Sequence, residues 1–262
     1  HATIRRQRQM CIRDRASTGV DVYTIRQPVG VCVGITPFNF PVMVPLWMFP
    51  NAIACGNTFI LKPSDRNPSA PEFIIKLMNE AGFPKGVVNL INGGAETVNQ
   101  LLSHDDVDAV SFVGSTPVAK HIYESATAGG KRVQALGGAK NHMVVLPDAD
   151  IDLAADSAVS AAYGSAGERC MAISVVVAVG EVAEPLVNAI SDRIDNLKIG
   201  PGMQPDSEMG PLISEEHRNR VVDYINSGEA EGATVVCDGR MHSPEQKGFY
   251  VGATLLDNVT TD

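Results

Sequence analysis

Hydrophobic positions in the first half of the chain alternate between short apolar runs and longer segments in which apolar residues recur every three or four positions. The runs are rich in β-branched residues and are predicted to be buried strands, at 29–35, 58–61, 87–91 and 109–113. The predicted helices lie at 40–54, 70–80, 95–102 and 117–127. This alternation is typical of an α/β fold with a doubly wound parallel sheet that helices cover on both faces.

A second series of strands and helices begins after Gly138. Its members are predicted at 142–146, 151–163, 173–179, 182–194 and 215–231. We therefore expect two domains, one over 27–137 and one over 138–262. In the first domain, ligands should bind at the carboxyl ends of the parallel strands, as is general in doubly wound sheets.

The first eighteen residues differ from everything that follows. They have no periodic apolar face, and their basic residues outnumber a single acidic one; the basic residues are Arg5, Arg6, Arg8, Arg13 and Arg15. We predict that residues 1–18 are either not native to the protein or disordered. A basic targeting arm is the alternative.

Residues 27–61 contain no charged side chain, which raises the question of a membrane span. The stretch contains several prolines, which would break such a helix, and asparagines, whose polar groups would stay unsatisfied in lipid. A buried strand, a turn and a core helix are expected instead.

The composition narrows the class of partner. The chain has 262 residues, of which 44% are hydrophobic and 19% charged, and its formal net charge is -9. These values are typical of a soluble globular protein, and the acidic balance favours a small molecule over nucleic acid as the partner. The 5 cysteines form no C-x-x-C pair and the 6 histidines have no ligand spacing, so we predict no disulfide framework and no metal site. A reducing compartment fits this cysteine usage best.

The candidate chemistry centres on Cys170, which lies in the stretch GSAGERCM over 164–171. The thiol is next to the cation of Arg169, and a carboxamide, Asn39, lies in an apolar segment far away in sequence. Such groups can attack a carbonyl and hold the resulting oxyanion. Two other cysteines, Cys32 and Cys55, lie in apolar runs and are expected in the core.

Two strand ends are candidates for binding phosphate or ribose, although neither a G-x-G-x-x-G motif nor a P-loop occurs. Gly114 and Ser115 lie between a strand and a helix, where backbone N–H groups can bind an anion. The alternative is an ordinary helix cap formed by Ser115 or Thr116. Lys62 follows another strand, and it either binds a ribose hydroxyl or is simply solvated.

Five short motifs carry a resemblance to a known family. They are TPFNFP at 36–41, LKPS at 61–64, FVGST at 112–116, LGG at 136–138 and the stretch around Cys170. In this order and at these separations they resemble the aldehyde dehydrogenase superfamily over about residues 20–262. The resemblance implies a partial NAD-binding domain over 27–137, a partial α/β catalytic domain over 138–262, and part of an oligomerisation strand at 19–26.

The resemblance also implies which residues bind the cofactor. NAD would lie along the carboxyl edge of the sheet, in contact with Thr36, Phe38, Lys62, Ser64, Asp65, Gly114, Ser115, Leu136 and Gly137. Lys62 and Asp65 would meet the adenosine ribose, and Gly114 and Ser115 the pyrophosphate. A carboxylate at Asp65 disfavours a 2′-phosphate, so NAD is expected over NADP.

Ala135 marks a departure from the hydrolytic members of the family. They carry a glutamate before the LGG triplet, and this glutamate activates water to hydrolyse an enzyme-bound thioester. Without that base, a nucleophile that ionises more readily than water is favoured, and coenzyme A is such a nucleophile. The chain therefore looks most like the CoA-acylating methylmalonate-semialdehyde dehydrogenases.

In that branch of the family each candidate residue acquires a role. Cys170 would form the thioester, and Asn39 would hold the oxyanion. Phe38 would contact the substrate as well as the cofactor, and Arg169 would pair with the substrate carboxylate and favour the thiolate form of Cys170. A surface or structural salt bridge of Arg169 with Glu168 or another acid is the alternative for the arginine.

The implied reaction oxidises methylmalonate or malonate semialdehyde to propionyl-CoA or acetyl-CoA with loss of CO2, in valine or inositol catabolism. A hydrolytic NAD-dependent aldehyde dehydrogenase and an inactive nucleotide-binding fragment stay open as alternatives. The resemblance further implies a homotetrameric parent protein that extends beyond this chain at both ends and binds neither nucleic acid nor membrane. Its expected location is the cytoplasm, or the mitochondrial matrix in a eukaryote.

Overall fold

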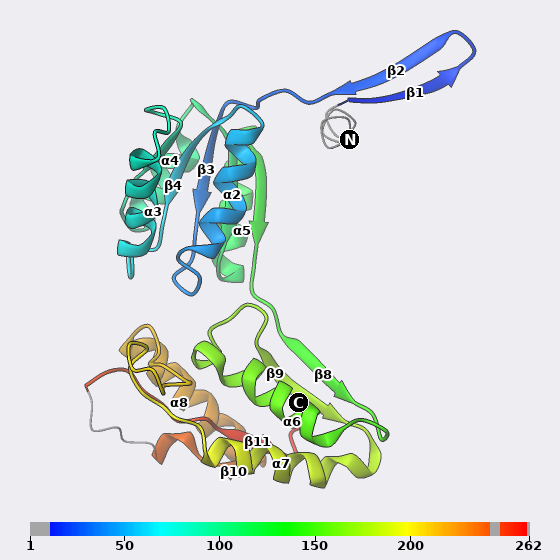
Figure 1. Cartoon of the computed structure of the whole chain (residues 1–262), viewed down its shortest axis with the longest axis vertical. Coiled ribbons are helices and arrows are strands. Elements are labelled where there is room, and N and C mark those ends of the chain that lie inside the picture. Colours follow the sequence, from blue (N-terminus) through cyan, green and yellow to red (C-terminus); the bar gives the residue numbers. More distant parts are fainter. Residues whose placement is uncertain (1–10, 242–246, 261–262) are drawn as a thin grey trace. The chain divides into compact units, whose positions relative to one another are not determined.

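The computed structural model describes residues 11–241 and 247–260. The chain divides into two compact units, His1–Gly137 and Gly138–Asp262, so the boundary falls inside the LGG triplet. Each unit has its own parallel strands (Figure 1). Each also has its own hydrophobic core.

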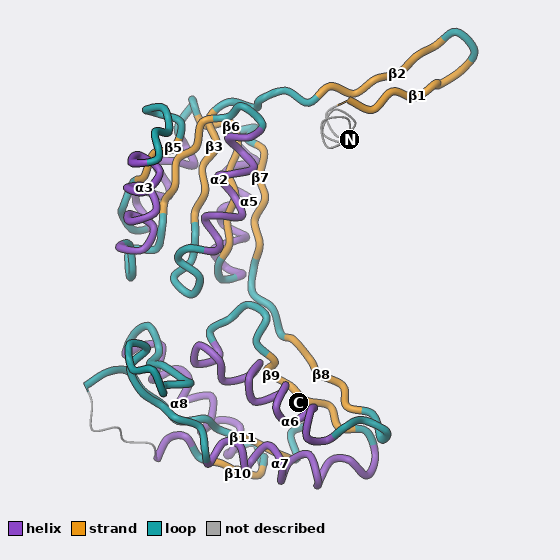
Figure 2. Tube along the Cα trace, viewed as in Figure 1, coloured by secondary structure: helices purple, strands orange, loops and turns teal. Residues whose placement is uncertain are grey.

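The first unit is built on a five-stranded parallel sheet with the order β5-β4-β3-β6-β7 (Figure 2). The strands are β3 (Val31–Ile35), β4 (Thr58–Lys62), β5 (Val88–Leu90), β6 (Val107–Val113) and β7 (Arg132–Leu136). The chain runs outward from β3 to β5 and then returns to the other side of β3. The strand order therefore reverses between β3 and β6, which is where ligands bind in such sheets.

Helices cover both faces of this sheet, and they are α2 (Met43–Ala54), α3 (Ser69–Glu80), α4 (Ala95–Ser103) and α5 (Thr116–Ala128). On one face Phe59 and Leu61 of β4 are buried in a cluster with side chains of α2 and α3. On the other face Val33 of β3 is buried with Ile122 of α5 and with side chains of α4. The doubly wound α/β fold expected from the sequence is confirmed. The strand β7 was not predicted, because its alternating burial leaves it without a continuous apolar run.

The uncharged stretch 27–61 forms β3, α2 and most of β4, as expected for a strand, a turn and a helix. The helix α2 begins at Met43 and is 12 residues long. None of the helices in the described residues combines the length and the apolar composition needed to cross a membrane.

Of the two possibilities given for residues 1–18, disorder is wrong for residues 11–17. They form a strand, β1 (Cys11–Ser17), which pairs antiparallel with β2 (Val20–Ile25). Gly19 has a φ of +78°, which a glycine tolerates without strain and which permits the tight turn between the strands. A backbone ladder satisfies the main chain of a basic segment even without an apolar face. Residues 1–10, the other part of the predicted disordered segment, lie outside the described residues.

The second unit begins with two parallel strands, β8 (Asn141–Val145) and β9 (Ile173–Ala178). Between and after them lie the helices α6 (Ile151–Tyr163) and α7 (Ala183–Asp195). Val145, Ala155 and Leu186 form part of the core that joins β8 to both helices. Alanines on α6 allow the close approach of the helices in this core.

The remaining elements of the second unit follow α7. They are α8 (Glu215–Ala230) and the antiparallel pair β10 (Thr234–Cys237) and β11 (Leu255–Asp257), with short 3-10 turns η1 (Gly164–Gly167), η2 (Gly180–Val182) and η3 (Gly239–Met241). The hydroxyl of Tyr163, at the end of α6, donates to the carbonyl of Thr254 at 2.8 Å. Burial raises the pKa of Tyr163, so this hydroxyl stays protonated and keeps donating.

Candidate active site

The strands of the first unit end beside the residues that the sequence assigned to the cofactor. Thr36 follows β3, Lys62 ends β4, Gly114 follows β6, and Leu136 ends β7. Because carboxyl ends of parallel strands meet at one edge of a sheet, these residues share that edge (Figure 2). Thr36 and Gly114 flank the point where the strand order reverses.

Thr36 is suited to meet a group that comes from outside the chain. The residue is 4% exposed, and its N–H donates to the Lys62 carbonyl at 3.1 Å. Its Oγ1 is buried and has no hydrogen-bond partner among the described residues. A buried hydroxyl without a partner is unfavourable, so an external donor or acceptor would stabilise it.

The loop after Thr36 carries Phe38 and Asn39, and both residues are half-buried. The side chain of Asn67 donates from Nδ2 to the Phe38 carbonyl at 2.7 Å. The main chain beside Asn39 is therefore held from two directions, by β3 and by Asn67.

Lys62 is a buried cation and not the solvated lysine that the sequence left open. It is 5% exposed, and its Nζ donates to the Gly93 carbonyl at 2.8 Å. Burial lowers the pKa of Lys62, and the nearby carboxylate of Asp65 partly opposes this shift. An ammonium has three N–H donors, and Gly93 uses one within the described part of the chain. The other two suit ribose hydroxyls.

Ser64 and Asp65 continue from the end of β4. The Oγ of Ser64 accepts from the Arg66 N–H at 3.3 Å, and Asp65 is exposed. The Asp65 carboxylate lies over Gly94, with its Oδ2 3.9 Å from the position that a Cβ would take there. The carboxylate thus stands beside the carbonyl that binds Lys62, since Gly93 and Gly94 are consecutive.

Ser115 occupies the N-cap position of α5, but its side chain makes no capping hydrogen bond. Ser115 is exposed, and Pro117 in the first turn of this 13-residue helix carries no N–H group. The positive end of the helix dipole lies at Ser115 and favours an anion there. Gly114 must stay a glycine here, because a Cβ would lie 2.4 Å from Cζ of Phe112.

The end of β7 lies against the start of α5. The Gly114 N–H donates to the Leu136 carbonyl at 3.1 Å. A Cβ on Gly137 would lie 2.9 Å from Oγ1 of Thr116. Ala135 packs against the core of the sheet, and its methyl group offers no proton acceptor at this edge.

The segment that carries Cys170 has an unusual backbone. Three consecutive residues are left-handed, with φ values of 53° at Ser165, 53° at Ala166 and 71° at Gly167. Such values are uncommon for residues with a side chain and indicate local strain. The Ala172 N–H then donates to the Arg169 carbonyl at 3.1 Å and closes a turn around Cys170, which is exposed.

Arg169 folds back over the start of this segment. Its Nε donates to Oγ of Ser165 at 3.3 Å. The guanidinium lies on the bare Cα of Gly164, where a Cβ would come within 2.7 Å of Nη2. The side chain of Arg169, the residue before Cys170, is thereby held by its contact with Gly164 and by the hydroxyl of Ser165.

Glu168 has partners other than Arg169. Its Oε1 accepts from the Ile213 N–H at 3.2 Å and lies 3.4 Å from Nε2 of His217 on α8. Burial raises the pKa of Glu168, and the Ile213 N–H partly opposes the shift. The carboxylate therefore ties the Cys170 segment to the start of α8, while the Arg169 guanidinium donates to Ser165.

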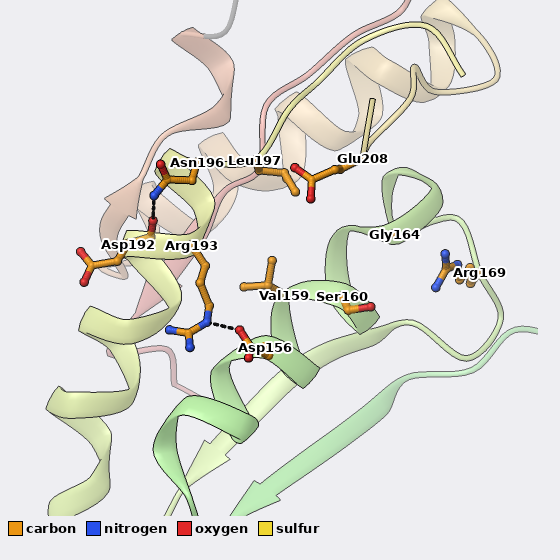
Figure 3. Close-up of a pocket in the computed structure, with 10 residues that line it drawn as sticks. All are labelled: Asp156, Val159, Ser160, Gly164, Arg169, Asp192, Arg193, Asn196, Leu197 and Glu208. Atoms are coloured by element: carbon orange, nitrogen blue, oxygen red, sulfur yellow. Dashed lines mark hydrogen bonds and ion pairs between the residues drawn. The ribbon is translucent and has the colours of Figure 1, made fainter. Parts of the chain in front are cut away.

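A cavity of about 530 Å³ adjoins Arg169 (Figure 3). It lies between α6, α7 and the segment that carries Glu208, and Arg169 lines it at one end. On α7, Arg193 pairs with the carboxylates of Asp152 and Asp156. Cys170 is not among the lining residues, so the cavity adjoins the guanidinium but not the thiol.

The predicted residues thus fall into two groups. The cofactor candidates and Asn39 belong to the first unit, and Cys170 and Arg169 share one loop of the second unit. The expectation that Cys55 is a core residue is wrong: it is exposed, because it ends α2 as the C-cap. Cys32 is half-buried, and no group of His, Cys, Asp or Glu suited to a metal ion occurs among the described residues.

Sequence reasoning missed two polar residues that hold these loops, Asn67 and Asn141, and it considered Glu168 only as a partner of Arg169. Each acts through a hydrogen bond to or from the main chain of a distant segment. Asn141 lies three residues after the LGG triplet, and no spacing rule connects it with Cys170. The single signal in the sequence for these residues was that a polar side chain lies at the end of a strand or loop.

Comparisons with known proteins agree on one family. A sequence model described as the aldehyde dehydrogenase family matches residues 2–262. Malonate-semialdehyde dehydrogenase of Halalkalibacterium halodurans is 55% identical over 246 residues, which are 94% of this chain and 51% of that protein. The chain spans about half the length of the curated relatives it matches.

Solved structures are similar over nearly the whole chain. Methylmalonate-semialdehyde dehydrogenase from Oceanimonas doudoroffii is 54% identical with a TM-score of 0.91, over 95% of this chain and 52% of that one. A putative methylmalonate-semialdehyde dehydrogenase from Sinorhizobium meliloti, complexed with NAD, is 49% identical with a TM-score of 0.94. That likeness covers 98% of this chain and 53% of the other.

Proposed function

Since the chain belongs to the aldehyde dehydrogenase family, we propose that it supplies the cofactor edge and the nucleophile of an NAD-dependent, CoA-acylating semialdehyde dehydrogenase. Its substrate class is a short aldehyde with a carboxylate two carbons from the carbonyl carbon, such as malonate or methylmalonate semialdehyde. The observation that carries this proposal is the loop on which an exposed thiol, Cys170, follows a guanidinium held in place, Arg169.

The residues at the carboxyl edge fit a dinucleotide. The buried Oγ1 of Thr36 and the spare donors of Lys62 suit hydroxyl groups, and the start of α5 with Ser115 suits a pyrophosphate. Asp65 would accept from a ribose hydroxyl and repel a 2′-phosphate, so NAD is the expected form. NAD, when bound, accepts the hydride that the aldehyde carbon loses.

The thiol chemistry follows from the second unit. The Cys170 thiolate adds to the aldehyde carbon, and the resulting oxyanion is held by the Asn39 carboxamide and the Cys170 N–H. Arg169 binds the substrate carboxylate with two parallel N–H bonds, which orients the carbonyl toward the thiol. Loss of the hydride leaves a thioester on Cys170.

The fate of the thioester depends on Ala135. An alanine at the sheet edge cannot activate water, so hydrolysis of the thioester lacks its base. For a malonyl group, the C–C bond to the carboxylate breaks with release of CO2, and the carbanion takes a proton to give an acetyl thioester. The CoA thiolate then attacks the thioester carbonyl, and Cys170 leaves as the thiolate.

The test uses the polypeptide that the complete gene encodes, with NAD and malonate semialdehyde, in the presence and absence of CoA. Products are identified by mass spectrometry. Acetyl-CoA that forms with NADH, and is absent with Cys170→Ala, supports the proposal. Free acid formed at the same rate without CoA would contradict the CoA-acylating activity and support the hydrolytic alternative.

A further inference from the structure

One carboxamide holds the main chain on both sides of the candidate nucleophile. Nδ2 of Asn141 donates to the Cys170 carbonyl at 2.9 Å and to the Ala172 carbonyl at 3.0 Å. Both partners are carbonyl oxygens, which only accept hydrogen bonds. The NH2 end of the amide must therefore face them, and both of its N–H donors are used.

The strand pairing explains why Asn141 reaches this loop. Asn141 is the first residue of β8, and it is in register with Ile173, the first residue of β9. The register shifts between Asn141 and His142, so Asn141 sits at an irregular point of the ladder. Its side chain thus lies beside residues 170–172, the turn that leads into β9.

These bonds bear on the groups that react. The carbonyl of Arg169 is held by the Ala172 N–H at 3.1 Å, and this carbonyl belongs to the same planar peptide as the Cys170 N–H. The carbonyl of Cys170 is held by Asn141. Together, the turn and the carboxamide fix the peptide planes before and after Cys170, so they fix the direction of both its N–H and its Cα–Cβ bond.

We infer that Asn141 is a positioning residue for Cys170, which it acts on only through these main-chain bonds. The catalytic consequence of this role depends on the proposed function. The backbone is strained at Ser165 and Ala166, and Cys170 is exposed, so the two Asn141 bonds supply order where the loop needs it. Loss of the bonds frees the turn and lets the Cys170 N–H leave the direction of the oxyanion.

Asn141→Asp is the test variant, because the carboxylate keeps the shape of the side chain but presents oxygen to both carbonyls. Asn141→Ala removes the donors without adding charge. Asn89→Asp is the matched control: Nδ2 of Asn89 also donates to two main-chain carbonyls, those of Gly86 and Phe59, in the first unit.

Two readouts separate the positioning role from the proposed function. Hydrogen exchange, followed by mass spectrometry on the complete polypeptide, should speed up by about tenfold in peptides spanning 164–173 for both Asn141 variants and stay unchanged there for Asn89→Asp. In steady-state assays, kcat should fall by about 10-fold to 100-fold, with KM for NAD within about twofold of the native value.

Unchanged exchange in peptides 164–173 of both variants overturns the inference, whatever the activity. Faster exchange with native kcat also overturns it, since the turn would then be held without consequence for the reaction. If the native polypeptide forms no NADH that depends on Cys170, the proposed function fails, and the exchange data alone decide whether Asn141 holds the loop.

Discussion

The two units position their candidate residues in different ways. In the first unit, residues distant in sequence meet because parallel strands end at one edge, so regular structure places Thr36, Lys62 and Gly114. In the second unit the candidate nucleophile Cys170 lies in an irregular loop with left-handed backbone. Two hydrogen bonds from Asn141 and one from the Ile213 N–H to Glu168 hold this loop. The positions of the cofactor candidates depend on many residues of the sheet, whereas the position of the Cys170 thiol depends on a few.

This difference has a consequence for mutagenesis. A substitution at the sheet edge should remove one contact and leave the others in place, because the buried strands keep their positions. A substitution in or beside the Cys170 loop should change the reaction itself, because individual hydrogen bonds and not strand pairing hold the loop. Binding of NAD and reactivity of the thiol should therefore respond to different residues.

The largest effect is expected for Cys170→Ala. Removing the nucleophile should lower kcat by at least about ten-thousandfold, because no thioester can form. The dissociation constant for NAD, measured by fluorescence titration, should stay within about threefold of the native value. A loss of NAD affinity as large as the loss of kcat would contradict the assignment of NAD binding to the first unit and of the nucleophile to the second.

The next largest effect is expected at Arg169, which is proposed to bind the carboxylate of the substrate. Arg169→Lys keeps the positive charge but loses the planar fork that binds a carboxylate with two bonds. We expect kcat/KM for malonate semialdehyde to fall by about 10-fold to 100-fold, and kcat/KM for propanal to change by less than about threefold.

Gly164→Ala sharpens this test, since its Cβ would displace the guanidinium without changing any charge. Gly202→Ala is the matched control, because no atom lies within 4 Å of the position its Cβ would take. Equal losses for both aldehydes in Arg169→Lys would point to a structural role for the arginine.

A smaller effect is expected at the sheet edge. Lys62→Met removes donors to the ribose, so KM for NAD should rise by about tenfold while the alkylation rate of Cys170 by iodoacetamide stays native. Lys120→Met is the control, because Lys120 is exposed on α5 and pairs with Glu124. An unchanged KM for NAD in Lys62→Met would leave the buried ammonium with a structural role alone.

The smallest effect is a pH dependence of stability in the second unit. Burial raises the pKa of Glu168, so the folded chain binds this proton more tightly than the unfolded chain. The contribution of Glu168 to stability is therefore present in acid and is lost as the pH rises through the raised pKa.

Glu168→Gln does not titrate, and it keeps an acceptor for the Ile213 N–H. Relative to this variant, the native chain should lose stability as the pH rises from the ordinary pKa of a glutamate, about 4, through the raised pKa of Glu168. Thermal unfolding at a series of pH values measures the difference, and a difference that is constant or grows in favour of the native chain would contradict the account.

Periodicity was sufficient to predict most of the scaffold. The segments 151–163 and 215–231, for example, correspond closely to α6 and α8, because their apolar spacing and their caps Asp150 and Ser214 are local signals. The edge strand β7 was not predicted, since its alternating burial gives no continuous apolar run, and β1 was not predicted, since its sequence CIRDRAS has no such run.

Motif order was sufficient to single out the thiol and the residues of the sheet edge. It could not reveal what holds them, because the bonds from Asn67 to Phe38 and from Asn141 to Cys170 join segments 29 residues apart through the fold. Likewise, the buried state of Lys62 depends on Gly93, from a separate βα loop, whose carbonyl accepts its hydrogen bond.

The central claim is that Cys170 forms a thioester that waits for CoA because Ala135 supplies no base for water. The most direct measurement is NADH release from malonate semialdehyde in the first turnovers, without CoA. The account predicts a burst of about one NADH per Cys170, a stall, and renewed NADH formation with acetyl-CoA as product when CoA is added. Linear NADH formation without CoA, with free acid as the product, would contradict it.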